Sequence, residues 1–291
     1  MGEGLKRHTR LEREEVIDAL VPPIIRHMGH QLVALGVGGS FARGTDSAYS
    51  DLALTGFVKK PAGARSASRF VHDGLVVDIW FPTRREFLDI HKAKIGPSWP
   101  FTAQIALLPL INDAFIRELN AMPYNNSAQD RMRALGEFWP EIQEAAAKLL
   151  TAVEGGNVAP VPYLYWQAVE KFCVALSLLN ARPFTTRAAM FGEARQFPIL
   201  PASFEELLIP ADQAVGAVEL ARRVHKGFWE IERLLTAHGL CLQAPSLDAF
   251  VREQTFGELL RDSLHVDRFG HREAKSRQQE QLRLGARPAE P

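Results

Sequence analysis

One short segment carries two glycines followed closely by a hydroxyl and a guanidinium, a combination that suits phosphate binding. Gly38 and Gly39 let the backbone approach an anion, and the residues after them are expected to begin a helix. Ser40 adds a hydroxyl donor, and Arg43 adds a planar fork that matches phosphate oxygens. The segment therefore predicts a phosphate-binding turn between a strand and a short helix.

Two carboxylates follow at positions expected to lie on strands. Asp51 opens the apolar run 51–58, and Ala53 shares its face because side chains alternate along a strand. Asp78 lies inside a second apolar run, 75–81, where an unpaired carboxylate is costly to bury. For one acid alone, a structural cap or a salt-bridge partner is the alternative. Together, beside the glycine turn, Asp51 and Asp78 predict an Mg²⁺ site that faces nucleotide phosphates.

The elements that must position these residues follow from apolar spacing. A helical stripe covers 11–28, although Pro22-Pro23 should kink or split it. Strands are predicted at 31–37, 51–58 and 75–81, with a hairpin turn at Asp73-Gly74. Thr83, with Glu86 three residues later, predicts the capped start of a helix that runs to about residue 92. Long helices are then predicted at 128–153, 161–179, 211–238 and 247–264.

The change in character near residue 125 predicts two domains. Residues 1–125 are expected to form an α/β domain, a small mixed sheet with helices. Residues 126–243 are expected to form an all-α helical bundle. Residues 244–291 are expected to form an extension of one helix and a disordered tail, because the last residues are polar.

Composition narrows the classes of function. With 34 basic and 34 acidic residues the net charge is zero, which argues against binding nucleic acid through broad phosphate neutralisation. No apolar run is long enough to span a bilayer, and the charged N-terminal residues have no apolar signal core. We therefore expect a cytoplasmic protein with no membrane partner.

Several segments in order resemble the kanamycin nucleotidyltransferase family, the aminoglycoside 4′-adenylyltransferases of the polymerase-β-type superfamily. The glycine turn through Leu54, the strand LVVDIWF and the Ser98–Thr102 segment fit the first half. EIQEAAAK, ARPFTTRAAMFGEA and HKGFWEIERLLTAHG fit the second half. The resemblance covers about residues 10 to 243.

The resemblance implies roles that spacing alone does not. Ser40, Arg43, Ser50 and Lys148 match residues that contact the nucleotide phosphates in the family, beside the turn residue Gly39. Asp51 and Asp78 match two of three metal-binding acids, and Glu144 matches the catalytic base. From spacing alone, an exposed ion pair along one helix is the favoured interpretation of Glu144 and Lys148, and only the resemblance favours the site. Family members are homodimers with the active site between subunits, so a homodimer is expected.

The chain departs from the family pattern at three acidic positions. Ala53 replaces the remaining metal-binding acid, so metal binding should be weakened. Arg69 and Pro140 stand where members that act on kanamycin have glutamates. A polycationic acceptor is less well neutralised by such a site, so a neutral or anionic hydroxylated acceptor becomes equally plausible. Arg69, Trp99, Pro140 and Tyr163 are the candidate acceptor-pocket residues, with ordinary packing as the alternative for Tyr163.

These observations predict a small-molecule nucleotidyltransferase that transfers AMP from an Mg²⁺-bound nucleoside triphosphate to a hydroxyl of an antibiotic-like acceptor. Two alternatives stay open. The first is a catalytically degenerate member that binds a nucleotide, a small ligand or a partner, for which Ala53 is the main support. The second is an enzyme that acts on tRNA or another macromolecule, using a basic rim of Arg65, Arg69, Arg84 and Arg85.

Overall fold

The computed structural model describes residues 4, 6–61, 67–209 and 215–242. Residue contacts separate one compact unit, Met1–Leu240, from a second, Cys241–Pro291. The predicted extension from residue 244, with its helix at 247–264, lies outside the described residues. The domain boundary at residue 125 stays a prediction, although every described strand precedes it and long helices follow it.

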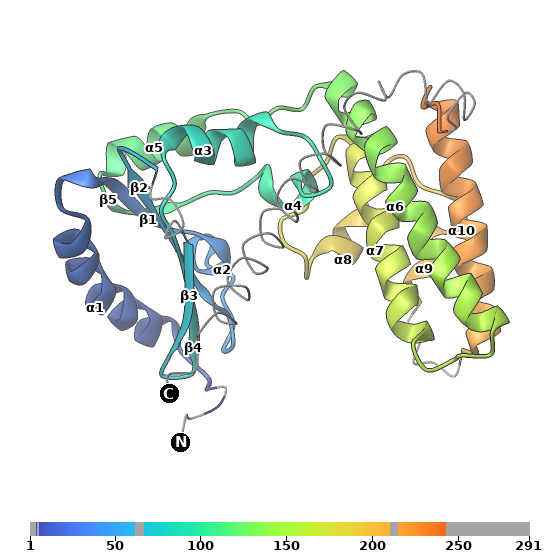
Figure 1. The fold of residues 1–291 in the computed structure, drawn as a ribbon, viewed down its shortest axis with the longest axis horizontal. Helices are drawn as coiled ribbons and strands as arrows, with labels where there is room; N and C mark the ends of the chain where they lie inside the picture. Colours follow the sequence, from blue (N-terminus) through green and yellow to red (C-terminus); the bar gives the residue numbers. More distant parts are fainter. Residues whose placement is uncertain (1–3, 5, 62–66, 210–214, 243–291) are drawn as a thin grey trace, which may run out of the picture. The chain divides into compact units, whose positions relative to one another are not determined.

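A five-stranded mixed sheet forms the first half, as the sequence predicts (Figure 1). Its strands are β1 Leu32–Val37, β2 Leu52–Val58, β3 Ala67–His72, β4 Leu75–Trp80 and β5 Leu108–Ile111. Their spatial order is β3-β4-β2-β1-β5, in which β2 and β4 run parallel and the other neighbours run antiparallel. The predicted turn at Asp73-Gly74 is confirmed, because both residues have positive φ and join β3 to β4.

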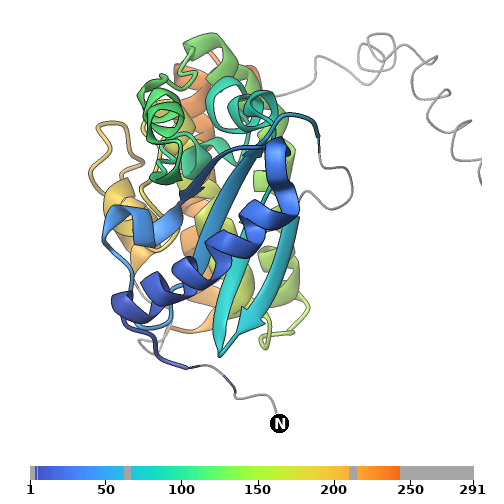
Figure 2. The same cartoon turned by 90° about the vertical axis from the view of Figure 1, so that its left-hand side faces the viewer.

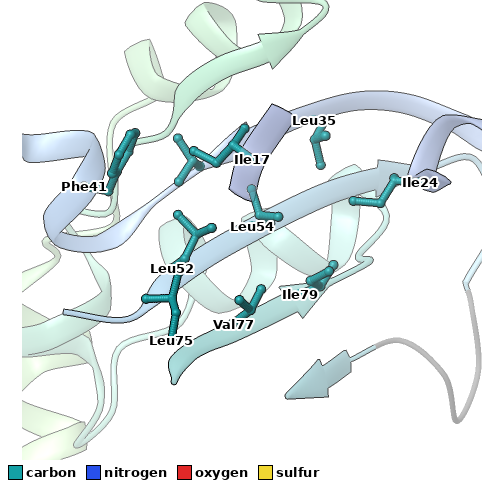
Figure 3. Close-up of a cluster of buried hydrophobic side chains, with 10 residues drawn as sticks. Ile17, Ile24, Leu35, Phe41, Leu52, Leu54, Leu75, Val77 and Ile79 are labelled. Carbon is teal, nitrogen blue, oxygen red and sulfur yellow. The ribbon is translucent and has the colours of Figure 1, made fainter. Parts of the chain in front are cut away.

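Helix α1, Arg10–Met28, covers one face of the sheet (Figure 2). A capping box between Thr9 and Glu12 begins it, and the assigned helix continues through Pro22 and Pro23 rather than splitting there. Ile17 and Ile24 of α1 pack on inward-facing side chains of the strands. Figure 3 shows this cluster, which also contains Leu35, Phe41, Leu52, Leu54, Leu75, Val77 and Ile79.

Among the described residues, helices cover the opposite face of the sheet toward one end. Phe57 of β2 packs there against Phe87 of α3, Arg84–Leu88, and in the same cluster as Ile116 of α5, Asp113–Ala121. Thr83 caps α3 as predicted, and a π-helical turn, η3, continues it over Asp89–Ala93. At the other end of this face Ala53 and Asp78 stay partly exposed. The candidate site lies at this open end.

The second half is helical, as predicted. Its long helices are α6 Ala128–Glu154, α7 Val161–Asn180 and α10 Ala217–Ala237, and both α6 and α10 pack against α7. The remaining short elements of the described chain are η1 Gly29–Gln31, α2 Gly39–Arg43, α4 Trp99–Thr102, α8 Met190–Ala194 and α9 Phe204–Leu208. None of the helices described, from residue 10 to residue 237, is long and apolar enough to cross a membrane.

Candidate functional site

The glycine turn docks directly on β2. The Gly38 amide donates a hydrogen bond of 2.8 Å to the carbonyl of Ala53. Gly39 has φ +67°, and a Cβ added there would lie 3.9 Å from the Cβ of Ala53. The short helix α2 follows and ends at Gly44, which is also left-handed. Glycine at position 39 therefore suits the left-handed backbone, whereas a Cβ there would make only an ordinary contact with Ala53.

A buried arginine of α1 fixes the loop that leads into β2. The side chain of Arg13 is 1% exposed. Its Nε and Nη2 donate to the Ser50 carbonyl at 3.2 and 3.1 Å, and Nη2 also donates to the Ser47 carbonyl at 2.5 Å. Asp46 in the same loop pairs with Arg10 at 2.7 Å and with Arg13 at 3.5 Å. These contacts fix the backbone of Ser50 and so the start of the segment that carries Asp51.

Three neighbouring strands bring Ala53, Asp78 and Arg69 into one row. Ala53 of β2 lies opposite Asp78 of β4, and Asp78 lies opposite Arg69 of β3. The Arg69 guanidinium donates from Nε to Asp78 Oδ1 at 2.5 Å and from Nη2 to Oδ2 at 2.7 Å. This bidentate pair occupies both oxygens of the carboxylate. The salt-bridge alternative considered for a strand carboxylate is therefore realised at Asp78.

The carboxylates of Asp78 and Asp51 both favour the charged form of Arg69. The pKa of Arg69 is raised, first by its hydrogen bonds to Asp78 and also by the negative charge of Asp51. Asp51 is exposed, so its carboxylate faces solvent close to Arg69. On the turn, Arg43 has a buried Nε with no hydrogen-bond partner among the described residues. A buried donor of this kind is costly unless it meets an acceptor, and a phosphate oxygen would supply one.

The carboxylates of this row do not fit Mg²⁺ as they stand. Mg²⁺ requires oxygen ligands in near-octahedral geometry, commonly one or two carboxylates together with substrate phosphates. Here Ala53 offers no oxygen, and both oxygens of Asp78 are engaged by Arg69. Of the two acids, Asp51 is the one whose carboxylate no described residue engages. In the described ranges no cluster of three or more His, Cys, Asp or Glu side chains could hold a metal ion.

Glu144 and Lys148 lie on α6 and pair with each other. The Lys148 Nζ is 2.8 Å from Glu144 Oε1, and both side chains are about 60% exposed. Lys148 lowers the pKa of the Glu144 carboxyl, first by its hydrogen bond and then by its charge. The two residues border a pocket of about 490 Å³ between α6 and α7 that is lined only by residues of the helical half. Within one chain, that pocket includes neither Asp51 nor Asp78.

The four acceptor-pocket candidates do not line a common pocket. Arg69 pairs with Asp78, Pro140 is an exposed residue inside α6, and Tyr163 borders a pocket of about 290 Å³ beside α8. Trp99 is 2% exposed, stacks edge-on with Tyr124, and donates its indole N–H to the carbonyl of Asn125 at 2.9 Å. Trp99 is therefore a core residue, and its assignment to an acceptor pocket is corrected.

The comparisons with known proteins agree with this fold. Residues 113–229 match a family model described as KNTase C-terminal domain. Over 240 residues the chain is 24% identical to an aminoglycoside nucleotidyltransferase (4′) of Staphylococcus aureus, a match that covers 79% of this chain and 93% of the relative. The corresponding protein of a Bacillus species matches equally well. The chain is kanamycin nucleotidyltransferase-like.

A solved structure of a nucleotidyltransferase-like protein from Exiguobacterium sibiricum is also similar, with a TM-score of 0.42 and 12% identity. That similarity covers 76% of this chain and 75% of the other. With a TM-score this low, that similarity carries no argument, and the likeness to kanamycin nucleotidyltransferases rests on the sequence matches. The family model runs from the first residue of α5 into α10, so it covers most of the helical half. The chain thus combines a kanamycin nucleotidyltransferase-like framework with a departure at the centre of the sheet.

The arginines proposed as a basic rim for a macromolecular substrate are each neutralised where the structure describes them. Arg69 pairs with Asp78, Arg84 with Glu118, and Arg85 with Asp89. Arg65 lies outside the described residues. Three cations paired with three carboxylates leave no excess of positive charge among these residues, so the structure offers no support for binding a polyanionic macromolecule here.

Proposed function

We propose that this protein transfers a nucleoside monophosphate, AMP in the leading case, from a nucleoside triphosphate to a hydroxyl of a small acceptor. One observation carries the proposal. The Gly38–Arg43 turn lies against the strand that contains Ala53, beside Asp51 and Asp78, and it presents a buried guanidinium N–H with no described partner. The distant relatives, whose names describe aminoglycoside nucleotidyltransferases, support the reaction class.

In this reaction the acceptor oxygen forms a bond to the α-phosphorus, and the bond from that phosphorus to the bridging oxygen breaks. Pyrophosphate leaves with the electron pair, and the acceptor proton moves to the carboxylate of Glu144. Ser40, Arg43 and Ser50 bind the phosphates with the Gly39 backbone, and Lys148 neutralises part of their charge. Catalysis of this kind depends on positioning and on stabilising charge rather than on a covalent intermediate.

Mg²⁺ is the cofactor that the family resemblance implies, and Asp51 and Asp78 are its proposed ligands. Ala53 and the Arg69–Asp78 pair leave an incomplete donor set, so we route no step through the ion. If the Arg69 side chain moved away, Asp78 could join Asp51 as a ligand. Titration of Mg²⁺ against the nucleotide-bound protein tests this assignment.

The acceptor that suits this site carries hydroxyls but little positive charge. Arg69 places a guanidinium where an ammonium-rich acceptor would need a carboxylate, and Pro140 contributes no charge. A like charge at a binding surface excludes a polycation through electrostatic repulsion. The proposed acceptor is therefore a neutral or anionic hydroxylated antibiotic-like molecule, and aminoglycosides serve as the comparison class.

A homodimer would bring the two groups of site residues together. Within one chain Glu144 and Lys148 border a pocket of the helical half, whereas Asp51 and Asp78 belong to the sheet. We propose that Glu144 of one subunit acts at the sheet of the other. Mixing Asp51→Asn with Glu144→Gln would then restore activity in about a quarter of the sites, because each mixed dimer keeps one intact site. No recovery on mixing would place both residues in a site within one chain.

The test of the reaction is pyrophosphate release from ATP with Mg²⁺, across aminoglycosides and neutral hydroxylated antibiotics. The protein is compared with Ala53→Glu and with Ala53→Glu combined with Arg69→Gln. We expect turnover by the unmodified chain with a neutral acceptor. Turnover by the double variant alone would show an intact transferase framework that is disabled at the row of Ala53, Asp78 and Arg69.

A second candidate is a nucleotide-binding protein that does not turn over, and one observation favours it. The bidentate Arg69–Asp78 pair occupies a carboxylate that the reaction would need for a metal ion. Under this candidate ATP binds, but no variant or acceptor yields pyrophosphate. If both the unmodified chain and the double variant neither bind nor cleave any nucleotide, both candidates fail.

A further inference from the structure

The Arg69–Asp78 pair leaves part of the guanidinium available to a ligand. A guanidinium has five N–H donors, and Asp78 accepts from one on Nε and one on Nη2. The remaining donors lie on Nη1 and on the outer edge of Nη2. Because the Arg69 side chain is 74% exposed, these donors are accessible from solvent. Asp78 thus orients the fork of Arg69 without using up its capacity to donate.

The exposed part of this guanidinium lies at the proposed nucleotide site. Arg69 shares one row with Asp78 and Ala53, and Ala53 contacts the Gly39 turn. The negative charge of Asp51 also reaches Arg69. A phosphate chain that lay along the turn would therefore pass close to a cation held on a carboxylate of the sheet. The guanidinium would then lie between a carboxylate and a phosphate, which is the position that a bridging divalent cation would take.

The pair has little to do with the stability of the fold. It joins an exposed arginine on β3, which within the described chain pairs only with β4, to a carboxylate that is 28% exposed. Ion pairs between exposed side chains usually contribute little to the stability of a fold. A variant that lacks the guanidinium should therefore fold, which makes the role of Arg69 in binding directly testable.

We propose that Arg69 supplies the positive charge that a divalent cation would otherwise supply, so that this site binds a nucleoside triphosphate without Mg²⁺. Asp78 then acts as a positioning residue for the guanidinium rather than as a metal ligand. The proposal rests on the proposed nucleotide site, and it deepens that site by assigning the group that neutralises the phosphates.

The experiment is calorimetric titration of the full chain with ATP, GTP, CTP and UTP in turn, in EDTA and in excess Mg²⁺. For the nucleotide that binds, we expect affinities in the two conditions to agree within about twofold. Arg69→Gln should weaken binding in EDTA by about tenfold or more, the usual cost of losing a charge-assisted hydrogen bond. Arg69→Lys should give an intermediate loss, since it keeps the charge without the fork.

Arg117→Gln is the matched control. Arg117 lies on α5, is 77% exposed, and pairs with a single aspartate, Asp113. Its replacement by glutamine therefore removes the same charge from a similar environment. Its affinity for nucleotide should equal that of the unmodified chain. Arg69→Gln should also gain a response to Mg²⁺, because Asp78 becomes available to join Asp51. Circular dichroism verifies that each variant is folded.

The outcomes separate this inference from the function on which it rests. Binding by the unmodified chain that falls about tenfold or more in EDTA overturns the role of Arg69 but keeps the nucleotide site. Unchanged affinity of Arg69→Gln in EDTA overturns it as well. Failure of all four nucleotides to bind in either condition overturns the nucleotide site itself, and the inference with it.

Discussion

Replacing Arg13 by methionine should both destabilise the protein and impair the candidate site. The substitution keeps an apolar stem of similar length but removes every donor of the side chain. The carbonyl oxygens of His8, Ser47 and Ser50 then lose bonds of 2.5–3.2 Å, and Asp46 loses one of its two arginine partners. All these groups meet at a side chain that is 1% exposed.

The size of the effect follows from these contacts. A hydrogen bond from a charged donor contributes about 1.5–3 kcal/mol, so loss of the bonds to three carbonyls gives a gross cost of about 4.5–9 kcal/mol. The contributions are not additive, and water would reach some of the freed carbonyls. Breaking a buried charged pair typically costs about 3–5 kcal/mol, and we expect Arg13→Met to lower the free energy of unfolding by this amount.

Urea denaturation followed by circular dichroism measures this loss, with Arg26→Met as the control. Arg26 is an exposed residue of the same helix, so its replacement removes an equal charge and should cost less than about 1 kcal/mol. ATP affinity is then measured below the unfolding transition, where it should fall because the Ser50–Asp51 backbone is no longer held. A loss of stability equal to that of Arg26→Met, or unchanged ATP affinity in a destabilised Arg13→Met, would refute the reasoning.

Three further perturbations test other parts of the structure. Gly227→Ala should lower the free energy of unfolding by about 1–3 kcal/mol in urea denaturation, because the new Cβ would lie 2.8 Å from Leu207 Cδ1 between α10 and α9; an unchanged midpoint would contradict that packing. Gly39→Ala should cost about 1–2 kcal/mol, since φ is +67° there, whereas Gly192→Ala, inside α8 with open space around it, should cost nothing or stabilise slightly. Burial lowers the pKa of His91 from 6.5 to about 4, so the unfolded chain takes up a proton first as the pH falls. Unfolding should become easier by up to about 3 kcal/mol between pH 6.5 and pH 4, and His91→Phe should remove that part of the pH dependence of stability.

The sequence predicts the central strands because their signals are local. Apolar runs at 31–37, 51–58 and 75–81 correspond to β1, β2 and β4, and the capping residue Thr83 marks the start of α3. β5 was not predicted because it has four residues and contains Pro109. It forms by pairing with β1, a contact distant in sequence, and proline is tolerated on such an edge strand.

The sequence names the residues of the candidate site, whose roles stay predictions, but the ion pair between Arg69 and Asp78 was not predicted. Once the Asp73-Gly74 turn is accepted, the register of a two-residue hairpin places Arg69 opposite Asp78, so their ion pair could have been read from the sequence. The role of Arg13 could not, because its bonds go to backbone carbonyls of a loop more than 30 residues away. Its position four residues before Ile17 places Arg13 on the apolar face of α1, but that spacing does not show what the guanidinium binds.

Because β3 lies at the edge of the sheet, Arg69 also affects how readily another molecule could dock there. Within the described chain, β3 pairs with β4 alone, so its outer row of backbone N–H and C=O groups could accept a strand from another molecule. Val71 on the same strand is 66% exposed and adds apolar surface there. A charged side chain in the middle of an edge strand opposes such docking, because association would bury that charge. The residue that pairs with Asp78 thus also protects the sheet against edge-to-edge aggregation.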